Sequence, residues 1–324
     1  MRQVEGLHHV TAIAGPAAEN LDFYAGVLGM RLVKKSVNQD DPGTYHLFYA
    51  DAVGHPGTDL TFFPWSQLAP ARRGHGLATE VALAVPPGSL EWWGDRLDRY
   101  AVALGALERR FGERALPLVD PHGLPVALVE SESAAARPFE PWSESPVPVE
   151  RQVRGLEGAR LDLRELGSST SFLAAVLGYG ERGVEGEWHR WEGPPGGSGR
   201  WLDLRETPQA PRGAWGQGSI HHLAFRVADE EHQLAVREQV LDAGGRPTEV
   251  IDRFWFRSVY FKEPGGVLFE LATDGPGFAV DEDPAHLGET LVLPPWLEAH
   301  RAEIERVLPP LVAPVAAGGE EGRS

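Results

Sequence analysis

The 324-residue chain contains no cysteine, which excludes disulfide bonds and every metal site that is built on thiolates. Any bound metal ion must therefore be held by nitrogen and oxygen donors. The chain also has no run of about 18 apolar residues, so no transmembrane helix is expected. Residues 1–5 lead into the first alternating run without the apolar segment of a signal peptide, and we therefore expect a cytoplasmic protein.

Cationic residues are scarce relative to anionic ones. The chain has 30 Lys and Arg against 47 Asp and Glu, which gives a formal net charge of -17. Binding to nucleic acid or to an anionic membrane surface depends on clustered Lys and Arg, so neither partner is expected. The hydrophobic fraction of 42% is that of a globular protein, and the 38 glycines and 27 prolines favour many turns and short strands.

The sequence repeats itself at two offsets. When the chain is shifted by 149 residues, Val27-Leu28-Gly29 coincides with Val176-Leu177-Gly178. When it is shifted by 143 residues, Arg110-Phe111 coincides with Arg253-Phe254. The chain therefore consists of four units, of which the first resembles the third and the second resembles the fourth.

Each unit has the same predicted order of elements. In the first unit, a strand near residues 6–13 precedes a helix whose apolar face runs from Leu21 to Leu28, and Gly29 ends that helix. Three strand-like runs follow, separated by turns that contain Asp, Pro and Gly. The order is βαβββ, repeated four times, and it predicts an α+β fold.

The four units are expected to form two tandem domains of ordinary size. The first covers residues 1–131, and the second covers residues 151–273 after a linker at residues 132–150 that contains Pro and Ser. Residues 274–324 form a tail with one short helix, at about residues 297–308. We expect this helix to cover an apolar edge rather than to close over a site.

Two His-His pairs stand at the start of alternating apolar runs, His8-His9 near the amino terminus and His221-His222 in the fourth unit. Successive side chains of a strand point to opposite faces, so one imidazole of each pair is expected to face a shared cavity. A single pair is more often packed or surface histidine. Two pairs at matching points, together with Glu270 in a nearly continuous apolar run, favour a metal site because a buried carboxylate needs a cationic partner.

Three motifs in this framework resemble one known superfamily. They are GLHHVT at residues 6–11, IHHLAF at residues 220–225 and GGVLFE at residues 265–270. With four βαβββ units they resemble the vicinal oxygen chelate superfamily of glyoxalases, bleomycin resistance proteins and extradiol dioxygenases. The likeness covers about residues 4–290 and is greatest to ring-cleaving dioxygenases of the hydroquinone 1,2-dioxygenase type. It implies that units pair edge to edge into cup-shaped half-barrels, with metal ligands on the first and last strands of each pair.

The repeat locates these ligand positions along the chain. The first-strand positions are His9, Glu80, Gly158 and His222, and the last-strand positions are about Phe62, Ala127 and Glu270. Because good donors occur only in the first and fourth units, the resemblance implies that these two units form the working cup. The middle pair is then a metal-free structural copy. The metal ligands implied are His9, His222 and Glu270.

This ligand set distinguishes among the chemistries of the superfamily. Glyoxalases fill four protein positions, whereas here the fourth position is assigned to Phe62, which cannot coordinate. Two imidazoles and one carboxylate with open positions beside them are typical of non-haem Fe(II) oxygenases, and Mn(II) is a realistic substitute for the iron. The resemblance therefore implies an Fe(II) enzyme.

The resemblance also implies supporting catalytic residues, namely His8, His221, Arg253 and Tyr260. The histidines are expected next to the ligands, while Arg253 and Tyr260 would orient a substrate hydroxyl group or stabilise its anion. Each residue has a structural alternative. The histidines could be packing residues, and Arg253 could form a salt bridge because the metal-free second unit has Arg110 at the same position.

Three further residues are candidates for substrate contact. Thr11 follows His9 by two residues on the same strand face and is expected to line the cavity. Trp255 and Phe256 lie beside Arg253 in the sequence, where either could stack on an aromatic ring. The remaining histidines, among them His46, have no matching ligand position and are not candidates.

These features together predict a ring-cleaving dioxygenase that acts on a hydroquinone- or catechol-type aromatic diol with O2 in the breakdown of aromatic hydrocarbons. Two other functions stay open. The first is a glyoxalase-like or thiol-transferase metalloenzyme, since fosfomycin-type enzymes also use two His and one Glu. The second is a metal-free small-molecule-binding protein of the kind that confers antibiotic resistance. Members of the superfamily often dimerise, so the resemblance allows a homo-oligomer.

Overall fold

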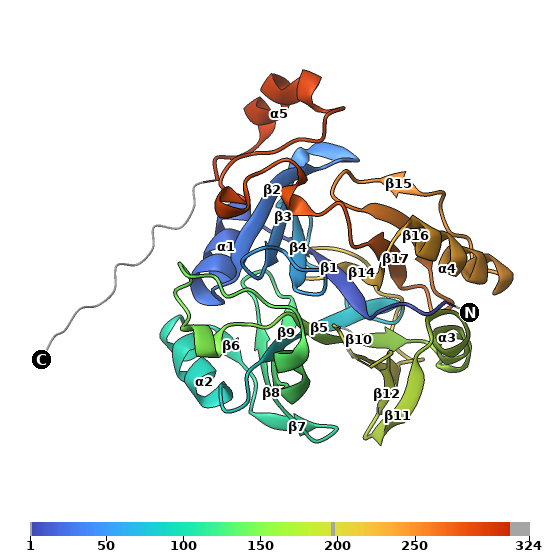
Figure 1. Ribbon diagram of the computed structural model, residues 1–324. Helices are drawn as coiled ribbons and strands as arrows, with labels where there is room; N and C mark the ends of the chain where they lie inside the picture. The colour runs from blue at the N-terminus through green and yellow to red at the C-terminus, as the bar shows by residue number, and fades with distance from the viewer. Residues whose placement is uncertain (1, 196–197, 312–324) are drawn as a thin grey trace, which may run out of the picture.

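The computed structural model describes residues 2–195 and 198–311. Strands dominate it and form two curled sheets, which lie one above the other in Figure 1. Helices α1 and α2 lie to one side of the strands in this view, and α3 and α4 lie to the other. The predicted α+β fold of βαβββ units is confirmed.

The first sheet has eight strands, in the order β15 (Ile251–Asp252), β16 (Arg257–Lys262), β17 (Leu268–Thr273), β14 (Ile220–Val227), β1 (Leu7–Ala14), β4 (Asp59–Pro64), β3 (Asp41–Ala50) and β2 (Arg31–Asn38). Strands β15, β16, β17 and β14 come from the fourth unit, and strands β1, β4, β3 and β2 come from the first. The expectation that the first and last units share one cup is therefore confirmed. The antiparallel pair β1 and β14 lies at the centre and joins the beginning of the chain to its last unit.

The second sheet has nine strands and is built in the same way from the two middle units. Eight of them follow the order β11 (Gly180–Glu185), β12 (Trp188–Glu192), β13 (Trp201–Glu206), β10 (Leu156–Leu163), β5 (Leu77–Val85), β9 (Pro125–Glu130), β8 (Glu113–Val119) and β6 (Ala103–Leu104), and β7 (Glu108–Arg110) pairs with β8. Its central pair, β5 and β10, is also antiparallel. Each sheet thus takes one unit from each half of the sequence.

One helix connects the first and second strands of every unit. These helices are α1 (Ala17–Leu21) continued by the π-helical η1 (Asp22–Val27), α2 (Leu90–Arg99), α3 (Gly167–Phe172) continued by the π-helical η4 (Leu173–Leu177), and α4 (Glu230–Asp242). The repeat is visible in the backbone as well. Gly29 and Gly178 end the first and third helices with φ values of +70° and +78°, a conformation that favours glycine.

Short helical turns complete the chain between the units and in the tail. They are η2 (Glu132–Ala136), η3 (Val149–Arg151), η5 (Phe278–Val280), η6 (Pro284–His286), η7 (Glu298–His300) and the last helix, α5 (Arg301–Val307). The predicted tail helix is therefore confirmed, although it is shorter than expected. Among the described residues, no helix is both long and apolar enough to cross a membrane.

The tail is fastened to the first sheet through cationic side chains of β2. Lys34 is fully buried, and its ammonium group donates to the Phe278 carbonyl oxygen at 3.0 Å and to Asp281 at 2.8 Å, with Glu282 as a further partner. Arg31 donates to carbonyl oxygens of residues 284 and 285. A buried ammonium group needs such partners, so these contacts hold the tail against the open side of β2.

The buried apolar residues of the first sheet belong to two clusters. A large apolar cluster contains the buried faces of α1, α2 and α4. A smaller cluster in the first sheet includes Val33, Phe48, Ala224, Trp255 and Phe278. The tail therefore contributes to the interior of the first cup, since Phe278 belongs to this smaller cluster.

Close packing in the second sheet predicts a position that tolerates only glycine. A Cβ atom at Gly158 on β10 would lie 2.3 Å from the ring of the fully buried Trp201 and 2.5 Å from its carbonyl oxygen. We expect Gly158→Ala to lower the free energy of unfolding by about 1–3 kcal/mol, because the neighbouring strand must shift. Gly94→Ala in α2, where a Cβ atom meets nothing within 4 Å, should be neutral or stabilising. Equal losses for both variants in urea denaturation would contradict this packing.

Candidate metal centre

Three strands that are neighbours in the first sheet carry the three predicted ligands. His9 lies on β1, His222 on β14 and Glu270 on β17. His9 and Glu270 face the same residue, Ala224 of β14, from its two sides. Because the side chain of Ala224 is only a methyl group, the space between the imidazole and the carboxylate stays open.

The donor atoms of these residues converge. Nε2 of His9 is 3.2 Å from Nε2 of His222, and Oε2 of Glu270 lies 3.3 Å from the first nitrogen and 2.9 Å from the second. Three ligands on one face of an octahedral ion with bonds of about 2.1 Å are about 3.0 Å apart. The arrangement therefore fits a divalent cation bound by two imidazoles and one carboxylate on a single side.

The charges around this point need a cation. His9, His222 and Glu270 are all buried, and Oε2 of Glu270 accepts no hydrogen bond within the described part of the chain. Burial disfavours the ionised carboxyl group, but His9 and His222 hold the pKa of Glu270 well below its usual value. Burial lowers the pKa of His222, so this imidazole is neutral and can offer a lone pair.

The other carboxylate oxygen of Glu270 has a partner of its own. Ser258 on β16 donates its hydroxyl hydrogen to Oε1 at 2.5 Å, and both residues are fully buried. This hydrogen bond fixes the rotation of the carboxylate and directs Oε2 toward the two imidazoles.

Two β-bulges place the partner histidines beside the ligands. Along the β1–β14 pair, His8 is the extra residue on one strand and His221 is the extra residue on the other. Strand alternation alone would turn these rings away from the ligands, but a bulge breaks the alternation. Nδ1 of His8 lies 3.0 Å from Nδ1 of His9, and Nδ1 of His221 lies 2.8 Å from Nδ1 of His222.

These contacts set the protonation of the ligand rings. A histidine that binds a metal ion through Nε2 carries its proton on Nδ1, and that proton needs an acceptor. Burial lowers the pKa of His8 and of His221 to about 3, so both are neutral and can accept at Nδ1. Each His-His pair can therefore supply one metal ligand and one acceptor.

The structure also brings Tyr260 and Arg253 to the site. Tyr260 lies opposite Glu270 in the β16–β17 pair, and its ring centre is 5.6 Å from that of His222. The Arg253 guanidinium lies 5.5 Å from the Tyr260 ring and donates to Asp40 at 2.8 Å. Burial raises the pKa of Tyr260 above its usual value, so its hydroxyl group is a hydrogen-bond donor.

The three residues expected to contact a substrate differ in what they pack against. Phe256 packs 5.2 Å from His9 and 5.4 Å from His8, measured between ring centres. Trp255 is buried against Phe48, and its indole N–H donates to Asp281 of the tail at 3.1 Å. Thr11 is buried on β1, two residues beyond His9. Phe256 is thus the nearer aromatic wall, whereas Trp255 connects the cup to the tail.

The strand register corrects the fourth ligand position. Glu270 stands opposite the residue two places after His222, and on β4 the corresponding residue, opposite Thr11, is Thr61. The position expected at about Phe62 is therefore Thr61, one residue earlier. Phe62 packs on the other side of the sheet against Tyr24, with ring centres 4.4 Å apart.

The structure also reveals His46, which the sequence comparison of ligand positions passed over. Its Nε2 lies 2.9 Å from the hydroxyl oxygen of Thr61. Burial, together with His9 and His222, lowers the pKa of His46 well below its usual value. His46 on β3 faces Ser36 on β2 and lies near Thr61 on β4. A prediction of how these three strands align would have identified it.

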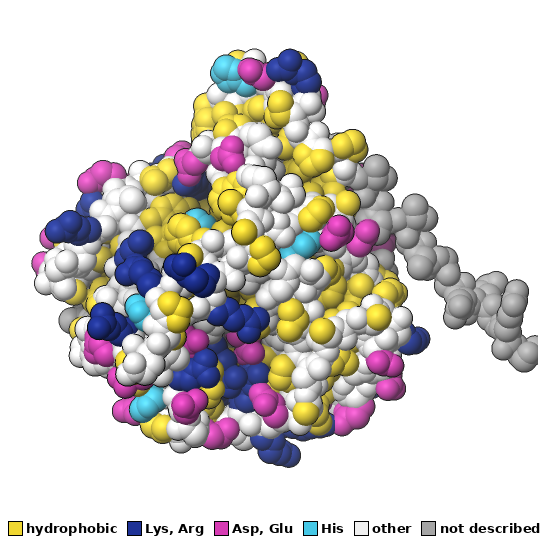
Figure 2. All heavy atoms as spheres, turned by 180° about the vertical axis from the view of Figure 1, so that it is seen from behind, with side chains coloured by type: hydrophobic (Ala, Val, Ile, Leu, Met, Phe, Trp, Pro, Cys, Tyr) yellow, Lys and Arg dark blue, Asp and Glu magenta, His cyan; other side chains and the backbone are white. Residues whose placement is uncertain are grey.

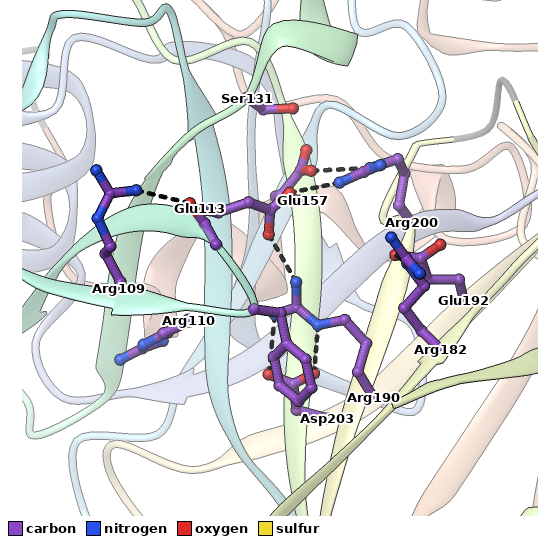
Figure 3. Close-up of polar contacts among 12 residues, drawn as sticks. Arg109, Arg110, Glu113, Ser131, Glu157, Arg182, Arg190, Glu192, Arg200 and Asp203 are labelled. Carbon is purple, nitrogen blue, oxygen red and sulfur yellow. Dashed lines mark hydrogen bonds and ion pairs between the residues drawn. The ribbon is translucent and has the colours of Figure 1, made fainter. Parts of the chain in front are cut away.

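The second cup has the same positions but fills them with paired charges. There, Glu80 corresponds to His222, and Asp203 on β13 corresponds to Thr61. Arg190 donates to both oxygens of Asp203 at 2.7 and 3.0 Å, and it also pairs with Glu113, as Figure 3 shows. Arg160 lies between the two carboxylates, 3.8 Å from Glu80 and 3.6 Å from Asp203.

Guanidinium groups thus neutralise the carboxylates of the second cup. On the surface, Figure 2 shows acidic and basic side chains side by side in the lower left part of the molecule. Within the described residues, only His9, His222 and Glu270 form a cluster of donors suited to a metal ion.

The Ser258 contact yields a prediction about metal affinity. We expect Ser258→Ala to weaken binding of Mn(II) about 10- to 100-fold, because the Glu270 carboxylate loses the bond that orients it. The change is measured by calorimetric titration of the apoprotein. Ser168→Ala removes an exposed serine that bonds only to nearby Glu165, and it should leave the affinity unchanged. Unaltered binding by the Ser258 variant would show that its hydroxyl group does not orient the carboxylate.

Comparison with known sequences places the chain among proteins of one superfamily. The family model described as Glyoxalase/Bleomycin resistance protein/Dioxygenase superfamily matches residues 6–85 and 163–271. MhqO of Bacillus subtilis (strain 168), named as a ring-cleaving dioxygenase, is 41% identical over 309 residues, which cover 95% of this chain and 97% of MhqO. The chlorohydroquinone/hydroquinone 1,2-dioxygenase of Sphingobium indicum is 34% identical over 314 residues, which cover 94% of this chain and 96% of that enzyme.

Solved structures agree with the sequence comparison. A crystal structure of a Bacillus subtilis protein named as a dioxygenase has a TM-score of 0.90 at 40% identity and covers 97% of this chain and 99% of that one. Glyoxalase I of Zea mays, at 14% identity, has a TM-score of 0.60 over 83% of this chain and 92% of its own, and it shares the fold. The protein therefore belongs to the glyoxalase/bleomycin resistance protein/dioxygenase superfamily.

Proposed function

We propose that the protein is a ring-cleaving dioxygenase that uses Fe(II) and O2 to open a hydroquinone- or catechol-type aromatic diol. The observation that carries this proposal is the one-sided set of donors on His9, His222 and Glu270. Two imidazoles and one carboxylate leave the other side of an ion free for two reactants, and this set is typical of non-haem Fe(II) oxygenases. The named activity of the Sphingobium indicum relative supports the same substrate class.

Bound Fe(II) would supply the transfer of electrons between the aromatic ring and dioxygen, and it would hold both reactants at one centre. The chain itself must bind and orient the diol. Phe256 provides an apolar surface beside His9, and the buried position of all three ligands keeps bulk water away. A flat aromatic ring suits such a wall better than a flexible aliphatic substrate does.

Tyr260 and Arg253 are the groups that we propose to contact the substrate oxygen. The Tyr260 hydroxyl group is protonated and can donate a hydrogen bond to a phenolate oxygen. Burial disfavours the charge of Arg253, but Tyr260 and Asp40 raise its pKa above the usual value. A permanent positive charge next to a neutral donor stabilises the deprotonated form of a diol.

His8 and His221 would act mainly on the imidazole rings of His9 and His222. Each accepts the Nδ1 proton of the neighbouring ligand, which directs the lone pair of Nε2 toward the ion. Within the described residues, Nε2 of His8 has no hydrogen-bond partner, although it is buried. Because Nδ1 accepts, the proton of the neutral His8 ring lies on Nε2, and this nitrogen is a hydrogen-bond donor.

The access route is marked by aromatic side chains around His221. Trp215 stacks on this imidazole with ring centres 4.3 Å apart and is 44% exposed, and Phe63 contacts the ring from another side. A cavity of about 180 Å³ adjoins His221 and Trp215. We propose that the diol approaches the ligands past these rings.

The glyoxalase reaction and a metal-free binding role are weaker explanations. A glyoxalase-like enzyme needs a fourth protein ligand, and the corresponding position here is the neutral Thr61. A metal-free binding protein would leave the Glu270 carboxylate buried between two imidazoles with Oε2 lacking a hydrogen bond in the described structure. Both arguments favour a metal centre with open positions.

Oxygen uptake tests the proposed function directly. We expect the apoprotein, reconstituted with Fe(II) under anaerobic conditions, to consume O2 with at least one member of a panel of hydroquinones and catechols. Glu270→Gln should lower iron binding more than about 100-fold and abolish uptake, because the anionic ligand is lost. His286→Ala, an exposed histidine paired with Glu289, is the control. No uptake across the panel, with turnover of the methylglyoxal–glutathione adduct instead, would overturn the proposal.

A second test separates substrate activation from metal binding. We expect Tyr260→Phe to keep one iron per chain but to lower kcat/KM about 100-fold, because a hydrogen-bond donor to the developing charge is removed. Tyr100→Phe alters an exposed tyrosine and should behave as wild type. Wild-type kinetics in Tyr260→Phe would exclude this tyrosine from the reaction.

A further inference from the structure

We infer that Thr61 keeps the fourth ligand position of the metal centre free, and that Thr11 and His46 hold its hydroxyl group in place. The inference rests on the proposed function, because a free position is what a substrate and dioxygen require. It assigns a specificity-determining role to Thr61 and a positioning role to His46.

The pairing of the strands identifies the position. Two residues after His222, Ala224 faces Glu270 on the parallel neighbour β17. Two residues after His9, Thr11 faces Thr61 on the parallel neighbour β4. The halves of this cup repeat the same pattern, so Thr61 stands where a second acidic ligand would complete a four-ligand site.

Hydrogen bonds already occupy the Thr61 hydroxyl group. Its oxygen lies 2.7 Å from the Thr11 hydroxyl oxygen and 2.9 Å from Nε2 of His46, and both threonines are fully buried. A threonine hydroxyl has one hydrogen to donate and two lone pairs. A neutral group engaged in two hydrogen bonds competes poorly with a carboxylate for a divalent ion.

His46 is itself fixed by packing. Its ring lies between Phe48, with ring centres 3.9 Å apart, and Phe63, with ring centres 4.4 Å apart. These aromatic contacts restrict the imidazole to one orientation, from which Nε2 reaches Thr61. The hydrogen bond to Thr61 is therefore built into the wall of the cup rather than formed by a mobile side chain.

The second cup shows that the fold accepts a carboxylate at this position. Asp203 stands at the point that corresponds to Thr61, and Arg160 stands at the point that corresponds to Thr11. There the carboxylate is bound by Arg190 and the position is closed by charge pairs. In the described part of the first cup, the Thr61 hydroxyl group bonds to Thr11 and His46 rather than to an arginine, so an acidic residue at position 61 would instead turn toward the metal ion.

The test compares Thr61→Glu with Thr61→Gln, which has the same size and no charge. We expect the apoprotein of Thr61→Glu to bind Mn(II) at least about tenfold more tightly in calorimetric titration. Water-proton relaxation should show about one exchangeable water fewer on its Mn(II). With Fe(II), diol-dependent O2 uptake should fall more than about 100-fold although one ion per chain is retained. Thr61→Gln should not gain affinity.

Folding of each variant is checked by thermal denaturation. If Thr61→Glu does not fold, the smaller Thr61→Asp with Thr61→Asn as its control provides the same comparison. Unchanged Mn(II) affinity and water number in the folded acidic variant would overturn the inference, even if the wild type turns over diols. Tighter Mn(II) binding without diol turnover by the wild type would support the inference and refute the proposed function.

Discussion

The antiparallel contact between β1 and β14 is the interaction on which the metal centre depends. It joins the first strand of the chain to the first strand of the last unit. His9 and His222 therefore meet although they are 213 positions apart in the sequence. The two β-bulges in this pair add His8 and His221 without lengthening the strands. A shift of one residue in this register would turn the ligand imidazoles to the opposite face and remove the site.

The two cups show two ways to neutralise buried carboxylates on the same framework. In the first, Glu270 faces the imidazoles of His9 and His222, and these three donors suit a divalent cation. In the second, Asp203 and Glu80 are neutralised by arginines. An unpaired buried charge is costly, so the carboxylates of each cup need cationic partners, and in the second cup arginines supply them. The four units therefore repeat the same fold, but the two cups differ in the residues that neutralise their carboxylates.

The sequence predicted the parts of this structure that depend on repetition and on local pattern. The unit order, the pairing of first and last units, and the convergence of His9, His222 and Glu270 all follow from the repeat and from the family motifs. It could not supply the register between strands that are distant in the chain. The bulges at His8 and His221 and the place of Thr61 instead of Phe62 depend on that register. His46 was missed because its contact with Thr61 depends on the register between the neighbouring strands β3 and β4.

Anomalous scattering from crystals loaded with Fe(II) or Mn(II) under anaerobic conditions tests the central claim most directly. One metal peak should appear per chain, in contact with Nε2 of His9, Nε2 of His222 and Oε2 of Glu270, and with no further protein ligand. The cup of Glu80 and Asp203 should contain no peak. A metal ion bound at Asp203, or a loaded crystal with no density among the three donors, would contradict the account.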